Sequence, residues 1–347
     1  MEADPANKER GLAIGSYLTP YKYGKPVIGP SGMDGTFNQY AADNMRIFRH
    51  RGRIYCMSIG FDGIGYQTAL AVSDDLLHWT DLGVVLPRGS RNPWDRVGRA
   101  ISCVLHDVDL YGNRELIKKD GKYWLFYHAY PEPGYETGGA ANGLAWTTDE
   151  ELLDWHFLDE PVFTKGAEGQ WDGAGLYSVW CVPYKDSFRL YYNGKSNPSW
   201  PWKEQVGLAM ATDNSLRHWE RYAGNPIHRV SLAGWDSVFA CGQHVLWDSR
   251  LQQWVQFFCG FDGRHAQDGV SISADGIHWR RHPEPIIPVG APGDLDSVHA
   301  HKPCVIWHED TLYHFYCAVR PTTTEEKPMF GKEYRCLTVA ASRPFKE

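Results

Sequence analysis

One signature recurs four times along this chain and constrains its fold more than any other feature. Each copy begins with Ser or Thr, continues with Asp and ends with Trp; the copies are Ser73–Trp79, Thr148–Trp155, Thr212–Trp219 and Ser273–Trp279. Self-similarity of this kind is typical of repeat architectures, in which each repeat is one supersecondary unit. We therefore expect a chain built from similar units placed side by side.

The signature belongs to a longer unit that occurs five times. Successive signature Trp residues are 76, 64 and 60 residues apart, and the length differences fall in Gly/Pro-rich stretches, where loops lengthen at little entropic cost. An apolar run, a turn and an aromatic run recur in the segments Met45–Met57, Leu116–Tyr127, Val179–Tyr192, Val245–Phe258 and Val305–Tyr316. These segments make five copies of the unit. Because the last copy ends close to the C-terminus, a strand from the residues before Lys25 is expected to complete it.

Each unit is predicted to hold three or four short β-strands. Arg51-Gly52 and Asp120-Gly121 are typical of hairpin turns, and Tyr123–Tyr127 is rich in strand-forming residues. Four strands in a unit of about 60 residues match the blade of a β-propeller, which leaves little exposed strand edge. The sequence thus predicts an all-β fold, a single five-bladed β-propeller over residues 1–347, with residues 1–24 closing the ring. A β-sandwich is the alternative.

Composition excludes several classes of function. Hydrophobic residues make up 43% and charged residues 22%, and the net charge is −7. Basic residues are scattered, so no nucleic acid is expected as a partner, and no membrane partner is expected because no apolar run is long enough to span a bilayer. The N-terminus lacks the pattern of a signal peptide, which favours a cytoplasmic location. The eight Cys residues show no CxxC spacing, so we expect buried thiols and no metal site or cofactor, although an ion in the central channel is possible.

The first strand of each blade should line the channel, and the starts of these strands are the expected place for a site. When the five copies are aligned on their aromatic runs, one level holds Asn44, Asn113, Ser178, Gly242 and Lys302. Two residues further on, the same face holds Arg46, Glu115, Trp180, His244 and Cys304. Polar residues this different in equivalent strands indicate a binding site rather than a repeated structural feature.

Acidic residues on these strands suggest a reaction. Asp43 and Glu115 stand at the starts of two of them, beside basic or amide neighbours such as Arg114. Cleavage of a glycosidic bond uses two carboxyl groups, one ionised and one protonated. We therefore expect Asp43 and Glu115 to face each other across the channel mouth, about 5–5.5 Å apart for a retaining enzyme or about 6.5–9.5 Å for an inverting one.

Another set of acids recurs at one position of the unit. It comprises Asp107, Asp172, Asp236 and Asp296. A carboxylate repeated in this way more often caps a turn than catalyses a reaction. Asp172 is nevertheless kept as a third catalytic candidate.

The combination of an Asp before a strand, a Gly-containing hairpin, aromatic second strands and the copy Ser273–Trp279 resembles the five-bladed propeller glycosidases. This group comprises glycoside hydrolase family 43, its invertase-like relatives and the mannoside-phosphorylase relatives, and the resemblance covers nearly the whole chain. It implies a first-blade base at Asp43 or Asn44 and a second-blade residue, at Glu115, that tunes a pKa. The third-blade acid of that pattern has no counterpart, since Ser178 stands there. The resemblance also places a channel histidine near His301.

Three functions follow as alternatives. The first is an exo-acting glycoside hydrolase on a small furanose or pentose-type sugar, with a carbohydrate as its small-molecule partner. The second is a phosphorylase of related fold, and the third is a non-catalytic carbohydrate-binding propeller. The predicted substrate-binding residues are Asn44, Arg46, Asn113, Arg114, Trp180, His244, His301 and Lys302; in a phosphorylase, Arg46, Arg114, His301 and Lys302 would bind phosphate.

Overall fold

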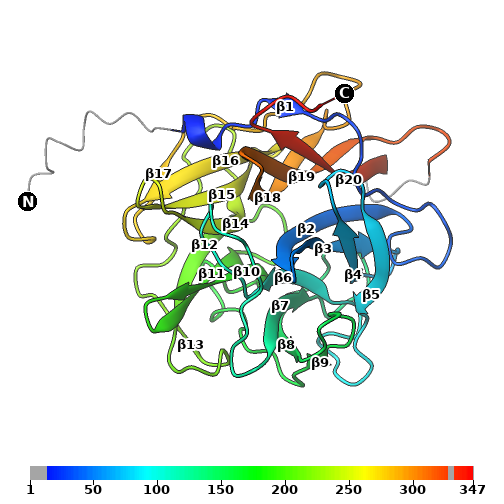
Figure 1. Cartoon of the computed structure of the whole chain (residues 1–347). Coiled ribbons are helices and arrows are strands. Elements are labelled where there is room, and N and C mark those ends of the chain that lie inside the picture. The colour runs from blue at the N-terminus through cyan, green and yellow to red at the C-terminus, as the bar shows by residue number, and fades with distance from the viewer. Residues whose placement is uncertain (1–13, 327–331, 347) are drawn as a thin grey trace, which may run out of the picture.

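The computed structural model describes residues 14–326 and 332–346, which form an all-β structure (Figure 1). Its one helical element among these residues is the 3-10 turn η2 (Gly15–Tyr17). No helix in this part of the chain has the length and apolar character needed to cross a membrane. The predicted all-β class is confirmed.

The strands form antiparallel groups that follow one another in chain order. The first groups are β2 (Ala41–His50), β3 (Arg53–Phe61), β4 (Tyr66–Ser73) and β5 (Thr80–Leu86), then β6 (Ala100–Val104), β7 (Tyr123–Ala129), β8 (Ala141–Thr147) and β9 (His156–Phe157), then β10 (Gly175–Tyr184), β11 (Ser187–Lys195), β12 (Glu204–Ala211) and β13 (Trp219–Arg221). The later groups are β14 (Phe239–Asp248), β15 (Gln253–Phe261), β16 (Ala266–Ser273) and β17 (Arg280–Arg281), then β18 (His299–His308), β19 (Thr311–Pro321) and β20 (Glu333–Ala341). The last group is completed by β1 (Tyr21–Lys22), which pairs with β20.

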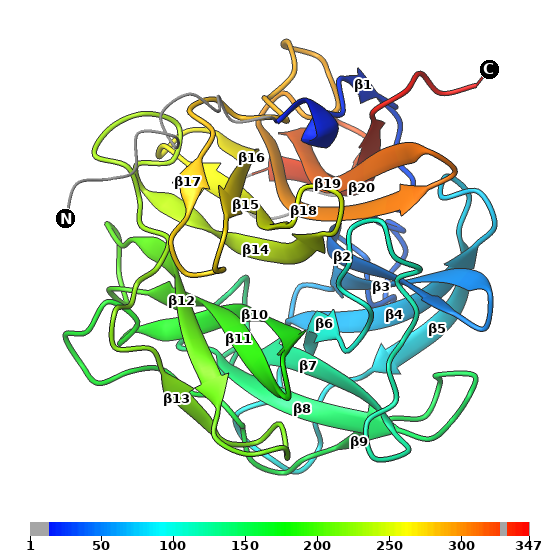
Figure 2. The same cartoon turned by 60° about the vertical axis from the view of Figure 1, so that its left-hand side comes forward.

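The groups surround a common centre, and their colours follow one another around it from blue to red (Figure 1). At this centre the first strand of each group contacts the first strands of its neighbours: β2 lies against β6 and β18, and β10 lies against β6 and β14. Figure 2 shows the same groups after a 60° turn. The two ends of the described chain meet at the last group, where the Val27 N–H also donates to the Leu337 carbonyl at 2.8 Å.

The repeated signature forms a tight turn at the outer end of a group. In the copy at Ser73–Trp79, Oδ1 of Asp75 accepts the backbone N–H groups of Leu77 and His78 at 2.9 and 2.8 Å. Leu76 adopts a left-handed conformation with φ of 68°, and Gly276 takes the equivalent place in another copy. The Trp79 indole N–H then donates to the Leu76 carbonyl at 3.3 Å. The signature is therefore a structural element that caps its own backbone, as repeated Asp and Ser side chains often do.

A second repeated feature lies at the start of each first strand. The register with the second strand shifts between Ala42 and Met45, Ile101 and Cys103, Leu176 and Val179, Cys241 and His244, and His301 and Cys304. A β-bulge of this kind bends a strand and redirects a side chain. The redirected residues include Asp43, Tyr177 and Lys302.

Candidate active site

The bulges of β2 and β18 bring Asp43 and Lys302 together at the centre of the molecule. Lys302, with φ of 67°, places its ammonium 2.7 Å from both carboxylate oxygens of Asp43. The Tyr66 hydroxyl donates to the same carboxylate at 2.6 Å, and an Arg335 nitrogen lies 3.8 Å away. The bulge thus accounts for the position of Asp43, which strict strand alternation with Asn44 and Arg46 would place on the opposite face of β2.

Asp43 is a fixed anion. Its side chain is fully buried, and burial alone would raise its pKa; the positive charges of Lys302 and Arg335 outweigh burial and hold the pKa far below its usual range. Burial alone would lower the pKa of Lys302. The negative charge of the Asp43 carboxylate outweighs burial and raises this pKa well above its usual value.

A cavity of about 420 Å³ opens beside this ion pair. Its volume lies within the range of about 300–1,000 Å³ typical of small-molecule sites. Its aromatic lining residues are Tyr135, Tyr177, Trp200, Trp202, Phe239 and Phe261. Its charged lining residues are Arg46, Glu136, Lys195, Glu204, Lys302, Glu333 and Arg335. Aromatic faces combined with a few charged groups suit a sugar, which offers both apolar C–H faces and hydroxyl groups.

Glu204 is a buried carboxyl group at the cavity wall, at the first position of β12. It is 7% exposed, and its oxygens accept the Trp202 indole N–H at 2.9 Å and the Asn193 amide at 3.2 Å. Burial raises the pKa of Glu204, the nearby charge of Glu136 adds to the effect, and the two hydrogen bonds oppose it. No basic residue lies within ion-pair distance of it among the described residues. Glu204 is thus suited to carry a proton.

Glu136 is a second carboxyl group that lines the cavity, and it lies in the loop between β7 and β8. Its Oε1 lies 3.5 Å from the Lys302 ammonium and 3.3 Å from the Tyr66 hydroxyl. Its φ of 53° is unusual for a residue with a side chain, and such conformations are often found at functional sites. Glu136 therefore has a cationic partner that Glu204 lacks.

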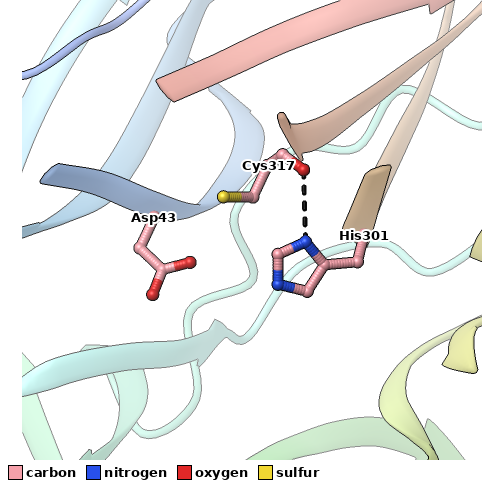
Figure 3. A group of neighbouring side chains, drawn as sticks. All are labelled: Asp43, His301 and Cys317. Carbon is pink, nitrogen blue, oxygen red and sulfur yellow. Dashed lines mark hydrogen bonds between the residues drawn. The ribbon is translucent and has the colours of Figure 1, made fainter. Parts of the chain in front are cut away.

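Asp43, His301 and Cys317 form a compact group (Figure 3), of which His301 lines the cavity. Their candidate ligand atoms lie within 4.8 Å of one another. The His301 ring meets the Cys317 carbonyl at 3.2 Å through Nδ1, and burial keeps its pKa well below the usual value. Asp43, however, already binds Lys302, and Arg335 lies beside it. Because these two positive charges would repel a cation, the group does not suit a metal ion.

The structure gathers only part of the predicted substrate-binding set at the cavity. Asn44, Arg46, His301 and Lys302 line it. Trp180, Arg114 and His244 are instead fully buried deeper in the centre, where Arg114 contacts His244 Nε2 at 3.1 Å and Trp180 donates to the Val245 carbonyl at 2.8 Å. Asn113 is exposed, and its side chain accepts the Glu115 backbone N–H.

The expected pair of Asp43 and Glu115 does not form. Glu115 accepts the backbone N–H of Arg51 at 2.7 Å, at the hairpin turn that follows the far end of β2. Since a strand rises about 3.3 Å per residue, roughly 20–25 Å separates this turn from Asp43. The pair was expected because the second copy was aligned on the wrong segment. The first strand of that copy is β6, whereas the segment around Glu115 makes only isolated bridges, one between Glu115 and Arg49 and one between Leu116 and His106. Ser102 takes the bulge position assigned to Asn113.

The repeated acids lie away from the cavity in similar structural settings. Asp172 is 2% exposed and accepts Arg221 Nε at 2.9 Å and the Tyr192 hydroxyl at 3.2 Å. Asp296 accepts Lys22 and the Tyr316 hydroxyl in the same way, and Asp236 pairs with Arg281. In the second group this place belongs to Asp95, which pairs with Arg99, and not to Asp107. Asp172 is therefore not brought to Asp43 or to the cavity.

We expect Asp236→Asn to destabilise the protein and to leave its chemistry almost intact. The change removes the charge that pairs with Arg281, which we expect to lower the free energy of unfolding by about 1–3 kcal/mol. Turnover of the folded variant should stay within about tenfold of wild type. Thermal unfolding and steady-state kinetics measure the two effects. Activity lower by several orders of magnitude at unchanged thermal stability would contradict a structural role.

Glu136 and Glu204 were not among the predicted residues. Both lie in or beside loops rich in Pro and aromatic residues, Tyr130–Glu136 and Asn197–Glu204, and outside the first strands on which the prediction was based. An acidic residue beside aromatic residues in such a loop is itself a signal, because loops on a rigid scaffold often carry binding residues.

The chain was compared with known protein families, curated proteins and solved structures. No protein-family model and no curated protein matches the sequence. The solved structure of BT0996 in an RGII complex is similar at 27% identity and a TM-score of 0.80, over 96% of this chain and 95% of that one. A structure of a glycoside hydrolase is similar at 26% identity and a TM-score of 0.79, over 100% and 97%.

A third structure supports the fold alone. Zg3597, a family 117 glycoside hydrolase produced by the marine bacterium Zobellia galactanivorans, is 15% identical with a TM-score of 0.64, over 94% of this chain and 91% of that one. The two more similar structures cover nearly the whole chain, and the cavity combines carboxyl groups with aromatic residues. The chain is accordingly an enzyme of the glycosidase type.

Proposed function

We propose that this protein is a five-bladed β-propeller related to glycoside hydrolase family 43, and that it removes a small furanose or pentose-type sugar from the end of a saccharide. The propeller is supported by the contacts of β2 with β6 and β18 and by those of β10 with β6 and β14, which lead from one group to the next around the centre. The pairing of β1 with β20 supports ring closure within a single domain. The volume of about 420 Å³ suits a short piece of saccharide better than a long polymer.

Glu204 and Glu136 are the proposed catalytic pair. The observation that carries this proposal is their contrast within one cavity: Glu204 is buried with a raised pKa and no basic partner, whereas Glu136 lies 3.5 Å from the Lys302 ammonium. Two carboxyl groups in environments that differ in this way are the usual arrangement for dividing acid and base roles. Asp43 is proposed as a positioning residue that holds Lys302, and through it Glu136.

The proposed reaction follows from the different surroundings of the two carboxyl groups. Glu204 gives its proton to the glycosidic oxygen as the bond between that oxygen and the anomeric carbon breaks, so the alcohol leaves neutral. Glu136 either removes a proton from the attacking water or bonds to the anomeric carbon and is later released by water. The Lys302 ammonium, 3.5 Å from Oε1, holds the Glu136 carboxyl group in place, and the aromatic walls of the cavity shield this contact from bulk water.

The proposal is tested by a screen of 4-nitrophenyl glycosides, among them arabinofuranosides and xylosides, each with and without inorganic phosphate. We expect release of 4-nitrophenol at a rate that does not depend on phosphate. A strict requirement for phosphate would instead indicate a phosphorylase. Measurable sugar binding without turnover of any glycoside would indicate a carbohydrate-binding module.

A further inference from the structure

Lys195 is a buried cation on the cavity wall that has no anionic partner. Its side chain, at the end of β11, is 8% exposed and lines the cavity. The ammonium lies 4.0 Å from the centre of the Trp202 ring. Across the part of the chain that the structure describes, no carboxylate forms an ion pair with it. Buried lysines are normally paired, because desolvation of an isolated charge is costly.

The other cations of the cavity already have partners. Lys302 binds Asp43 and Glu136, and Arg335 binds Glu333 at 2.7 Å. Arg46 has no carboxylate, but its guanidinium donates to the Asn44 side chain and to the Ser102 and Met45 carbonyls. Lys195 is the basic residue of the cavity wall whose ammonium is left available for a bound group.

The charge balance of the cavity points the same way. Four basic residues line it, namely Arg46, Lys195, Lys302 and Arg335. With Glu204 protonated, as its proposed role as the acid requires, the negative charges are Glu136, Glu333 and the adjacent Asp43. Under that proposal one positive charge remains in excess, in a protein whose net charge is −7. An anionic group on the substrate would neutralise it.

The position of Lys195 identifies the part of the substrate that would carry this group. Lys195 and Glu204 are direct partners in the β11–β12 pairing, so their side chains leave the same face of the sheet side by side. Glu204, as the proposed acid, must lie next to the oxygen that departs with the leaving group. Lys195 therefore stands on the leaving-group side of the cavity. The Trp202 ring beside it also meets the exposed ring of Trp200, at 5.2 Å between ring centres, and both rings line the cavity.

We infer that the leaving group is a sugar bearing a carboxylate, a uronic acid, and that Lys195 is the specificity-determining residue that binds this carboxylate. A lysine ammonium held against an indole face can form a charge-assisted hydrogen bond with a carboxylate oxygen. The inference rests on the proposed glycosidase function, because it uses the assignment of Glu204 as the acid. It adds a substrate class that the fold does not imply.

The test measures binding rather than turnover. Methyl glucuronide and methyl galacturonide are titrated against methyl glucoside and methyl galactoside, with tryptophan fluorescence and calorimetry as readouts. We expect wild type to bind each uronide at least about tenfold more tightly than its neutral counterpart, a difference of about 1.4 kcal/mol. Lys195→Met, which keeps the length of the side chain and removes its charge, should reduce this preference to within about twofold. Lys195→Arg should retain most of it.

Lys203→Met is the matched control, because Lys203 is exposed nearby and does not line the cavity; it should keep the full preference. Equal or undetectable binding of uronide and neutral glycoside by wild type would overturn the inference, as would a preference that survives in Lys195→Met. Inorganic phosphate that binds more tightly than the uronides and depends on Lys195 would overturn it in favour of phosphorolysis. Since binding does not require turnover, failure of the glycoside screen and failure of this inference are distinguishable.

Discussion

Glu204→Gln is expected to lower kcat on an unactivated glycoside by about 10²–10⁴-fold, the range that general acid catalysis supplies. Glutamine keeps the size of the side chain, and its carbonyl oxygen can still accept the Trp202 indole N–H. Its amide can donate to Asn193 Oδ1 once the Asn193 amide, which now donates to Glu204, turns over, so the cavity should keep its shape. The proton for the leaving oxygen is lost. Steady-state kinetics on a natural-type disaccharide and on a 4-nitrophenyl glycoside measure the effect.

Two further measurements, the dependence of the rate on the leaving group and on pH, distinguish the loss of a general acid from a nonspecific loss of activity. A 4-nitrophenolate leaves without protonation, so Glu204→Gln should recover most of its activity on the aryl substrate. In wild type the acid must be protonated, so kcat/KM should fall as pH rises through the raised pKa of Glu204, and this limb should disappear in the variant. Glu115→Gln is the matched control, because its carboxylate accepts the Arg51 N–H outside the cavity. Equal losses on both substrates with an unchanged pH profile would remove Glu204 from the role of acid.

The fold was open to prediction because its signals are local and repeated. Asp75 and Leu76 specify the same backbone turn as their counterparts in the other copies, through contacts within a few residues. Such contacts depend little on the rest of the molecule. The second copy was misaligned because β6 spans only Ala100–Val104 and is followed by a long connection before β7, so the aromatic run no longer follows the first strand directly.

The site was open to prediction only where it lies on the repeated frame. Asp43, Arg46, His301 and Lys302 come from first strands, and the structure brings them together at or beside the cavity. Glu136 lies in the loop between β7 and β8, and Glu204 lies at the first position of β12, so neither is on the first strands on which the prediction was based. Their meeting depends on how one loop folds over the centre, which involves contacts distant in sequence, such as that of Glu136 with Lys302. The spacing of residues along the sequence does not predict such contacts.

Removal of the Glu136 side chain is expected to have the other large effect. In Glu136→Ala, the group that activates water or attacks the anomeric carbon is gone, and kcat should fall by at least about 10²–10⁴-fold on every substrate. The variant lacks the group that acts at the anomeric carbon, not the group that protonates the leaving oxygen. A 4-nitrophenyl glycoside, which needs no such protonation, should therefore not restore the rate. This dependence is opposite to that expected for Glu204→Gln.

Azide supplies the positive test for Glu136. The anion fits the space left by the carboxylate and can attack the anomeric carbon from the same side, so added azide should accelerate Glu136→Ala and yield a glycosyl azide of inverted configuration. Glu333→Ala is the matched control: Glu333 lines the same cavity, but its carboxylate binds Arg335 at 2.7 Å, and its removal should give no azide product.

With Glu136 so identified, the anomeric configuration of the first wild-type product, followed by NMR, decides between the two roles. Retention would make Glu136 the nucleophile, and inversion would make it the base. If azide neither accelerates Glu136→Ala nor appears in the product, then Glu136 does not face the anomeric carbon, and Asp43, fixed as an anion beside Lys302, becomes the carboxylate to test next.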